Sequence, residues 1–211
     1  MQLLPVILPE PSILLCAFVS SCPLPVGPRC GCHIPPPLLL TMSATSGFKL
    51  NHVMIRVRDP EPSLKFYQEV LGMRLLYKMD VEMAKFTNYF MGHVTDEEYE
   101  LYQSFGAAEN NSPEKLKLLF GRLALVELCH NWGTESDESF KGYHGGNSEP
   151  RGFGHLCLSV PDLTAACKHF DDHKVKFTKR PDDGMIKGVA FIHDPDGYAI
   201  EIVQPDLPIS M

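Results

Sequence analysis

The sequence predicts an α+β fold made of two β-α-β-β-β modules that share one site. The first observation is an internal repeat, in which His52-Val-Met-Ile-Arg-Val-Arg-Asp59 resembles His155-Leu-Cys-Leu-Ser-Val-Pro-Asp162. The second is that each copy ends in an apolar strand with one acidic residue, Glu127 in LALVEL and Glu201 in YAIEIV. Self-similarity at a fixed spacing indicates that one structural unit is used twice.

Module one is predicted to cover about residues 48–130. Alternating side chains predict a strand at His52–Val57, with His52 and Arg56 on one face. Asp59 is then expected to cap a helix that Gly72 ends. The remaining predicted elements are strands at Met73–Met79, Ala84–Met91 and Leu123–Cys129, and a long polar loop at Val94–Pro113 that has room for a helical turn.

Module two, about residues 152–205, is predicted to repeat this order more compactly. Its first strand is His155–Val160, and Asp162 caps a helix with apolar positions from Leu163 to Phe170. The remaining predicted elements are strands at Val175–Lys179, Val189–His193 and Tyr198–Val203, and a turn at Asp194–Gly197. The segment 131–151 between the modules is rich in Gly, Ser, Asn and charge, which favours a binding loop.

Residues 1–41 differ in composition from the rest of the chain. They contain nine of the 18 prolines and four of the seven cysteines, and they show no helical or strand periodicity. We interpret them as a disordered or non-native extension, with Met42 as the working start. A cleaved targeting segment and a structured tail remain alternatives.

Charge and cysteine usage limit the partners and the compartment. The net charge of −7 argues against nucleic acid or an anionic membrane as a partner. Prolines interrupt every candidate apolar run, so no transmembrane helix is predicted. The isolated thiols of Cys129, Cys157 and Cys167 favour a reducing, cytoplasmic location. An organellar or secreted location would follow if the extension is a targeting segment.

Two histidines and two glutamates form the candidate site. Glu127 and Glu201 lie between apolar neighbours, and a buried carboxylate must be protonated, paired or bound to a metal. One such glutamate alone could face solvent at a sheet edge, but matched placement in two copies favours a shared role. With His52 and His155 they predict a metal site, whose N and O donors suit Zn²⁺, Ni²⁺, Fe²⁺ or Co²⁺ better than Mg²⁺ or Ca²⁺.

Four further polar residues suggest an anionic ligand. Arg56 shares a strand face with His52, Asn131 has the parity of Glu127, Arg151 lies just before His155, and Lys179 opens a polar loop. Together these groups could hold the carboxylates of a small ligand. Taken singly, each basic residue is more simply a solvated surface charge.

Several motifs resemble those of the glyoxalase I (lactoylglutathione lyase) family of the vicinal oxygen chelate superfamily. They are MIRVRDP, SLKFYQEVLGM, LVELCHNWGTE, NSEPRGFGH and KGVAFIHDPDGY, and the resemblance covers about residues 50–205. It implies a glyoxalase domain over 48–205, with paired half-barrel sheets around a metal site. It implies metal ligands at His52, Glu127, His155 and Glu201, and glutathione contacts at Arg56, Asn131, Arg151, Lys179 and the backbone near Gly184.

The resemblance also implies a reaction and an assembly. The family isomerises the hemithioacetal of methylglyoxal and glutathione to S-lactoylglutathione, using Zn²⁺ or, as the alternative, Ni²⁺. Glu201 is expected to be the base and Glu127 to serve the opposite face. A homodimer is expected to complete each site with one module from each chain. The alternatives are another metalloenzyme of the superfamily, such as a thiol transferase or dioxygenase, and a non-catalytic binding module.

Overall fold

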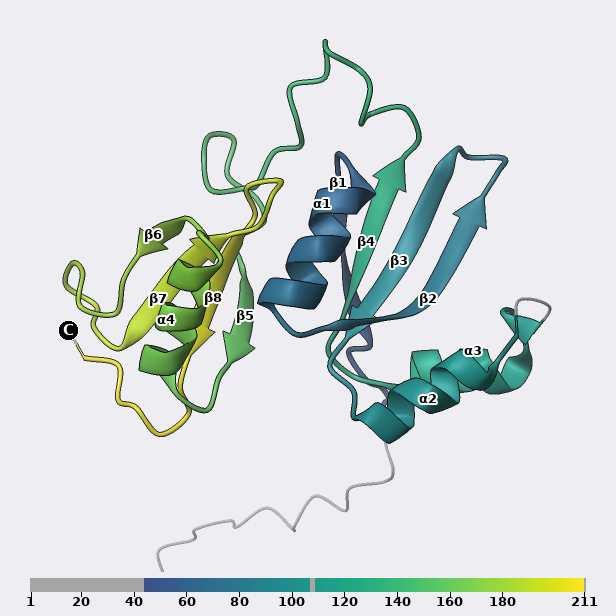
Figure 1. The fold of residues 1–211 in the computed structure, drawn as a ribbon, viewed down its shortest axis with the longest axis horizontal. Helices are drawn as coiled ribbons and strands as arrows, with labels where there is room; N and C mark the ends of the chain where they lie inside the picture. Colours follow the sequence, from purple (N-terminus) through teal and green to yellow (C-terminus); the bar gives the residue numbers. More distant parts are fainter. Residues whose placement is uncertain (1–43, 107–108, 211) are drawn as a thin grey trace, which may run out of the picture. The chain divides into compact units, whose positions relative to one another are not determined.

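Two four-stranded mixed sheets form the folded part of the protein. The computed structural model describes residues 44–106 and 109–210, which hold all the elements named below (Figure 1). The chain divides into Met1–Ser46 and Gly47–Met211, and both sheets lie in the second unit. The predicted extension over residues 1–41 lies outside the described residues.

Module one begins at the first strand of the repeat. Its elements are β1 His52–Val57, α1 Pro60–Lys65, the π-helical segment η1 Phe66–Val70, β2 Arg74–Val81, β3 Phe86–Gly92, α2 Asp96–Ser104, α3 Pro113–Gly121 and β4 Leu125–Asn131. The sheet order is β1-β4-β3-β2, with β1 parallel to β4 and the other pairs antiparallel. β1 buries Ile55 and Val57 and exposes Arg56, as the alternation predicts.

Module two has the same topology. Its elements are β5 Leu156–Ser159, α4 Leu163–Asp172, β6 Phe177–Lys179, β7 Val189–His193 and β8 Ala199–Val203. The sheet order is β5-β8-β7-β6, again with the first strand parallel to the last. The predicted α+β fold of two β-α-β-β-β modules is therefore confirmed, and the predicted strand ends differ from the observed ones by at most two residues.

The predicted helix caps are also confirmed. Asp59 accepts a hydrogen bond from the backbone N of Glu61, and Asp162 accepts one from the backbone N of Ala165, both at 2.9 Å. Gly72 has a φ of +70°, a left-handed conformation that favours glycine after a helix.

The prediction of a loop over Val94–Pro113 is wrong, because α2 lies within this segment and α3 begins at its end. Thr95 starts α2 with a capping box, in which the Glu98 side chain accepts from the Thr95 backbone N. Tyr102 of α2 and Leu119 of α3 are almost fully buried in a second core cluster with residues of module one's sheet. Most other side chains of α2 are exposed, which explains the loop-like composition.

The predicted turn at Asp194–Gly197 is present, and its side chains form hydrogen bonds with module one. Asp196 Oδ1 accepts from the backbone N of Arg58 at 2.8 Å, and Asp196 Oδ2 accepts from Ser63 Oγ at 3.1 Å. The Tyr67 hydroxyl donates to Asp194 Oδ2 at 3.1 Å. Burial raises the pKa of Asp194 to about 7. The two modules therefore meet through a buried polar network as well as a common hydrophobic core.

Two findings concern membrane-spanning helices and the state of the cysteines. Among the described residues, no helix is long and apolar enough to cross a membrane. Cys129, Cys157 and Cys167 are all free thiols.

Candidate metal centre

Each module brings one histidine against one glutamate. His52 Nε2 lies 3.0 Å from Glu127 Oε2, and His155 Nε2 lies 3.2 Å from Glu201 Oε2. The parallel strand pairs produce both contacts, because each histidine stands at or just before the start of one strand and each glutamate stands on the neighbouring strand. The structure therefore assembles two matching His–Glu pairs, one in each module.

A phenylalanine supports each histidine ring in the same way. Phe90 is the register partner of Glu127, and Phe191 is the register partner of Glu201. The His52 and Phe90 ring centroids are 5.3 Å apart and edge-to-face, and those of His155 and Phe191 are 5.4 Å apart in the same arrangement. Neither phenylalanine is among the predicted site residues, although each lies in the third strand of its module and the repeat could have indicated both.

Hydrogen bonds around His52 indicate which ring nitrogen carries the proton and which one presents a lone pair to Glu127. Asn51 Nδ2 donates to the backbone oxygens of Leu119 and Arg122, at 3.0 and 2.9 Å. Asn51 Oδ1 must therefore be an acceptor, so His52 Nδ1 donates to it across 2.7 Å. Nε2 of a neutral His52 then points its lone pair at a carboxylate oxygen. Two acceptors at this distance repel each other unless a proton or a cation lies between them.

The donor types and spacings fit a metal ion. Two ligand atoms bound at right angles to one metal by bonds of about 2.1 Å lie about 3 Å apart, close to the separations observed in both pairs. Among the described residues, however, no group of three or more His, Cys, Asp or Glu side chains is close enough to hold a metal ion. Each module thus offers two candidate ligands, and the described part of one chain does not bring all four together.

The two glutamates have different surroundings. The Glu127 side chain is 10% exposed and the Glu201 side chain is 22% exposed. Burial raises the pKa of Glu127, and the neighbouring His52 and the Asn88 amide oppose this effect. Glu201 is instead hydrogen-bonded to the Cys157 thiol, whose pKa is raised to about 11 by burial and by this carboxylate.

Two of the predicted ligand-binding residues come together in module one. Arg56 Nη1 donates to Asn131 Oδ1, which also accepts from the Tyr143 hydroxyl at 3.2 Å. The Arg56 side chain extends from the same exposed face of β1 as His52. The guanidinium and amide are therefore held next to each other on the strand face that carries the first His–Glu pair.

The other three predicted contacts lie beyond β4 in the chain. Arg151 Nε pairs with Glu149 at 3.0 Å, and Lys179 Nζ donates to the backbone oxygen of Val189 at 2.7 Å. Gly184 is exposed and has a left-handed φ of +64°. Within the described residues, no hydrogen bond or ion pair joins these three residues to Arg56 or Asn131.

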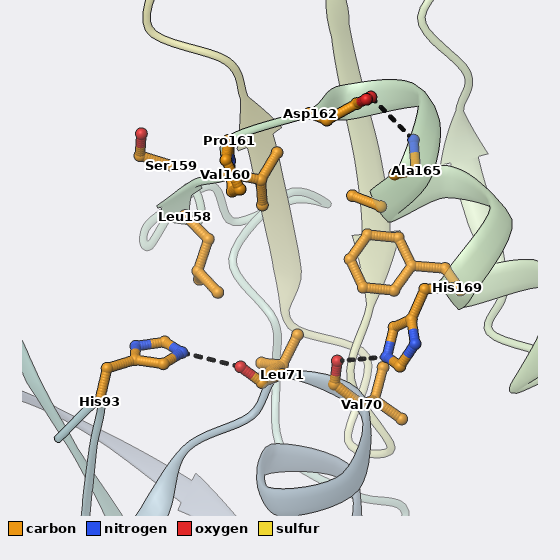
Figure 2. A pocket seen from close by; sticks show the side chains of 12 residues that line it. Val70, Leu71, His93, Leu158, Ser159, Val160, Pro161, Asp162, Ala165 and His169 are labelled. Atoms are coloured by element: carbon orange, nitrogen blue, oxygen red, sulfur yellow. Dashed lines mark hydrogen bonds between the residues drawn. The ribbon is translucent and has the colours of Figure 1, made fainter. Parts of the chain in front are cut away.

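A cavity of about 440 Å³ lies apart from the predicted site (Figure 2). Figure 2 shows that residues of both modules line it, and that His93 and His169 donate to the backbone oxygens of Leu71 and Val70. None of the predicted metal ligands or substrate contacts lines this cavity. The two His–Glu pairs therefore remain the candidate centre.

Comparisons with known proteins place the chain in a family. Residues 49–202 match the model of the Glyoxalase/Bleomycin resistance protein/Dioxygenase superfamily. A lactoylglutathione lyase of Pseudomonas aeruginosa is 50% identical over 163 residues, covering 77% of this chain and 86% of that protein. Glyoxalase I of Saccharomyces cerevisiae is 43% identical over 74% of this chain and 43% of its own length.

A solved structure agrees with these sequence matches. The crystal structure of glyoxalase I from Zea mays is similar with a TM-score of 0.51 and 28% identity. The match covers 77% of this chain and 44% of the maize chain, so this chain spans less than half of the yeast and maize proteins. By the family model, the sequence identities and the shared fold, the chain belongs to the Glyoxalase/Bleomycin resistance protein/Dioxygenase superfamily.

Proposed function

We propose that this protein is a metal-dependent lactoylglutathione lyase that removes methylglyoxal. It isomerises the hemithioacetal of methylglyoxal and glutathione to S-lactoylglutathione. The observation that carries the proposal is the repeated His–Glu contact, 3.0 Å in module one and 3.2 Å in module two. It occurs in a chain that is 50% identical to a lactoylglutathione lyase over most of that protein's length.

The metal is held by His52, Glu127, His155 and Glu201. Imidazole nitrogen and carboxylate oxygen form a donor set suited to Zn²⁺, with Ni²⁺ as the alternative. The bound ion supplies electrostatic stabilisation of negative charge that develops on the substrate oxygens. The facing acceptors of His52 and Glu127 support this assignment, because a cation removes their mutual repulsion.

Glu201 is the base that moves the substrate proton from C1 to C2. Proton transfer from carbon requires a base that can reach the reacting atom, and a carboxylate can be that base. Glu201 is the more exposed of the two glutamates, and no amide of the described residues donates to it as Asn88 donates to Glu127. Glu127 serves the opposite face of the site.

Glutathione is bound through its carboxylates by Arg56, Asn131, Arg151, Lys179 and the backbone near Gly184. Arg56 and Asn131 support this role because they are already joined on the face of module one that carries His52 and Glu127. A guanidinium next to an amide can bind a carboxylate through several parallel hydrogen bonds. The other three residues come from segments after β4, so the two modules each supply part of the glutathione site.

The active form is a homodimer in which module one of each chain meets module two of its partner. Each module supplies two metal ligands, and twofold symmetry makes two identical four-ligand sites. The separation of the four ligands into two pairs within one chain supports this arrangement. The enzyme works in the cytoplasm, where glutathione keeps thiols such as Cys129 and Cys167 reduced.

The test is to assay the purified full chain for S-lactoylglutathione formation and to measure metal content on the same sample. We expect about one Zn²⁺ or Ni²⁺ per chain, and activity that disappears on chelation and returns with metal. His52→Ala should lose metal and activity. His173→Ala should lose neither, because this exposed histidine lies outside both pairs. A metal-loaded protein that makes no S-lactoylglutathione would refute the proposal.

A further inference from the structure

We propose that Asn51 and Asn88 are positioning residues that preorganise the module-one half of the metal site. The inference rests on the proposed function, since it concerns how the metal site of that enzyme is built. It is carried by side-chain amide contacts that hold both ligands of module one and that have no counterpart among the described residues of module two.

Asn51 orients His52 and is itself held at the end of α3, a helix that was not among the predicted elements. Its amide nitrogen is fixed by backbone oxygens of Leu119, in α3, and Arg122, which follows α3. Its amide oxygen accepts from His52 Nδ1 at 2.7 Å. An outer acceptor on one ring nitrogen fixes the ring orientation and leaves the other nitrogen free to bind metal. The packing of α3 on the sheet thereby sets the direction of a metal ligand.

Asn88 holds Glu127 by a similar contact. It is 7% exposed, and its Nδ2 donates to Glu127 Oε1 while Oε2 faces His52. Asn88 Oδ1 is buried and has no hydrogen-bond partner among the described residues. A buried acceptor without a partner destabilises a fold. The polar contact that this buried side chain makes is its donor to Glu127, which fixes the direction of the carboxylate.

Module two has an apolar residue where module one has Asn88. Asn88 pairs with Cys129, two residues after Glu127 on β4. In module two the equivalent register position, two residues after the glutamate, is Val203, and its partner is Val189. The amide donor to the glutamate is thus replaced by a valine side chain that cannot donate.

The histidine of module two also lacks the outer amide. Gly154 precedes His155, where Asn51 precedes His52. Within the described residues, the only polar contact of the His155 ring is the one to Glu201. The His155 side chain is 43% exposed, against 32% for His52. Module one is therefore the more firmly held half of the site, whereas Glu201 of module two accepts from the Cys157 thiol, a weaker donor than an amide.

The test measures Zn²⁺ affinity of the full chain by competition with a chromophoric chelator. Asn88→Leu removes the donor at similar volume, and Asn51→Ser withdraws the acceptor from His52. Each variant should bind Zn²⁺ about 10–100-fold more weakly than the wild type. The Co²⁺-loaded variants should also show altered visible absorption bands, because the ligand geometry changes. If Asn88→Leu does not fold, Asn88→Val, which copies the module-two residue, replaces it.

Thr87→Val is the matched control. Thr87 is the buried neighbour of Asn88 on β3, and its hydroxyl bonds to Asp80 and Trp132, away from the metal ligands. This variant should lower the melting temperature and leave the Zn²⁺ affinity unchanged. Folded Asn51 and Asn88 variants with wild-type affinity and Co²⁺ spectra would overturn the inference alone. A wild type that binds no metal and makes no S-lactoylglutathione would overturn the proposed function and this inference together.

Discussion

Two variants that each lack one metal ligand can distinguish a metal site shared between two chains from a metal site within one chain. His52→Ala removes a ligand from module one, and His155→Ala removes a ligand from module two. Neither variant alone can build a four-ligand site, in either arrangement. Each homodimer should therefore lose most of its metal and activity.

The mixed dimer of these variants gives a quantitative expectation. If sites are shared, one of its two sites combines both damaged modules, and the other combines both intact modules. Equal co-expression makes about half of all dimers mixed, so about one quarter of wild-type activity and metal should return. If each site lies inside one chain, no activity returns, because every chain carries one damaged module. The expectation follows from the two separate His–Glu pairs of the structure.

The assay uses a different affinity tag on each variant, so that mixed dimers can be purified through both tags. S-lactoylglutathione formation and zinc content are then measured, and each should be about half of the wild-type value per dimer. Co-expression of His52→Ala with Glu127→Gln is the control, because both changes lie in module one and no site is intact. Stable mixed dimers without activity, or equal activity in the control, would refute the shared site.

Four other predictions follow from individual residues. Glu201→Gln should lower kcat by about 10²–10⁴-fold with metal still bound, and an unchanged kcat at full metal content would exclude it as the base. Arg56→Ala should raise KM more than it lowers kcat, measured by steady-state kinetics, since it contacts a part of the substrate that does not react. Burial raises the pKa of Asp194 to about 7, above about 3.9 in an unfolded chain. The unfolding free energy of metal-free protein should therefore fall between about pH 4 and pH 7, and urea titrations of Asp194→Asn should lack this part of the fall. Deleting residues 1–41 should leave kcat and metal content unchanged, because the family match begins at residue 49; a loss would show that the extension contributes.

The repeat predicted the fold well because each module is marked by local signals. The alternation of side chains along the segment predicted the His52–Val57 strand, and Asp59 and Asp162 predicted the helix starts. Each signal acts over a few residues and does not depend on distant parts of the chain. The reliance on local signals also explains why a loop was wrongly predicted at Val94–Pro113. Few residues of α2 pack on the sheet, and its exposed residues form no apolar stripe that would indicate a helix.

The site could be predicted only in part, because its outer contacts depend on strand register and helix packing. The His–Glu pairs were accessible through the repeat, but the partner of Asn88 is 39 residues away on another strand. Asn51 likewise reaches α3, 68 residues away at Leu119. Neither amide belongs to a local motif, so only the folded chain identifies them as neighbours of metal ligands.

The two halves of the proposed site face different physical requirements. A carboxylate that holds a metal benefits from a fixed position, because any movement weakens the bond. A carboxylate that moves a proton between two carbons must approach each of them in turn. Glu127 is buried and held by the Asn88 amide, whereas Glu201 is more exposed, and the strand position that corresponds to Asn88 in module two is Val189. Two modules of one topology can therefore supply both kinds of carboxylate, because side chains around the shared strand frame, such as Asn88 in module one and Val189 in module two, differ.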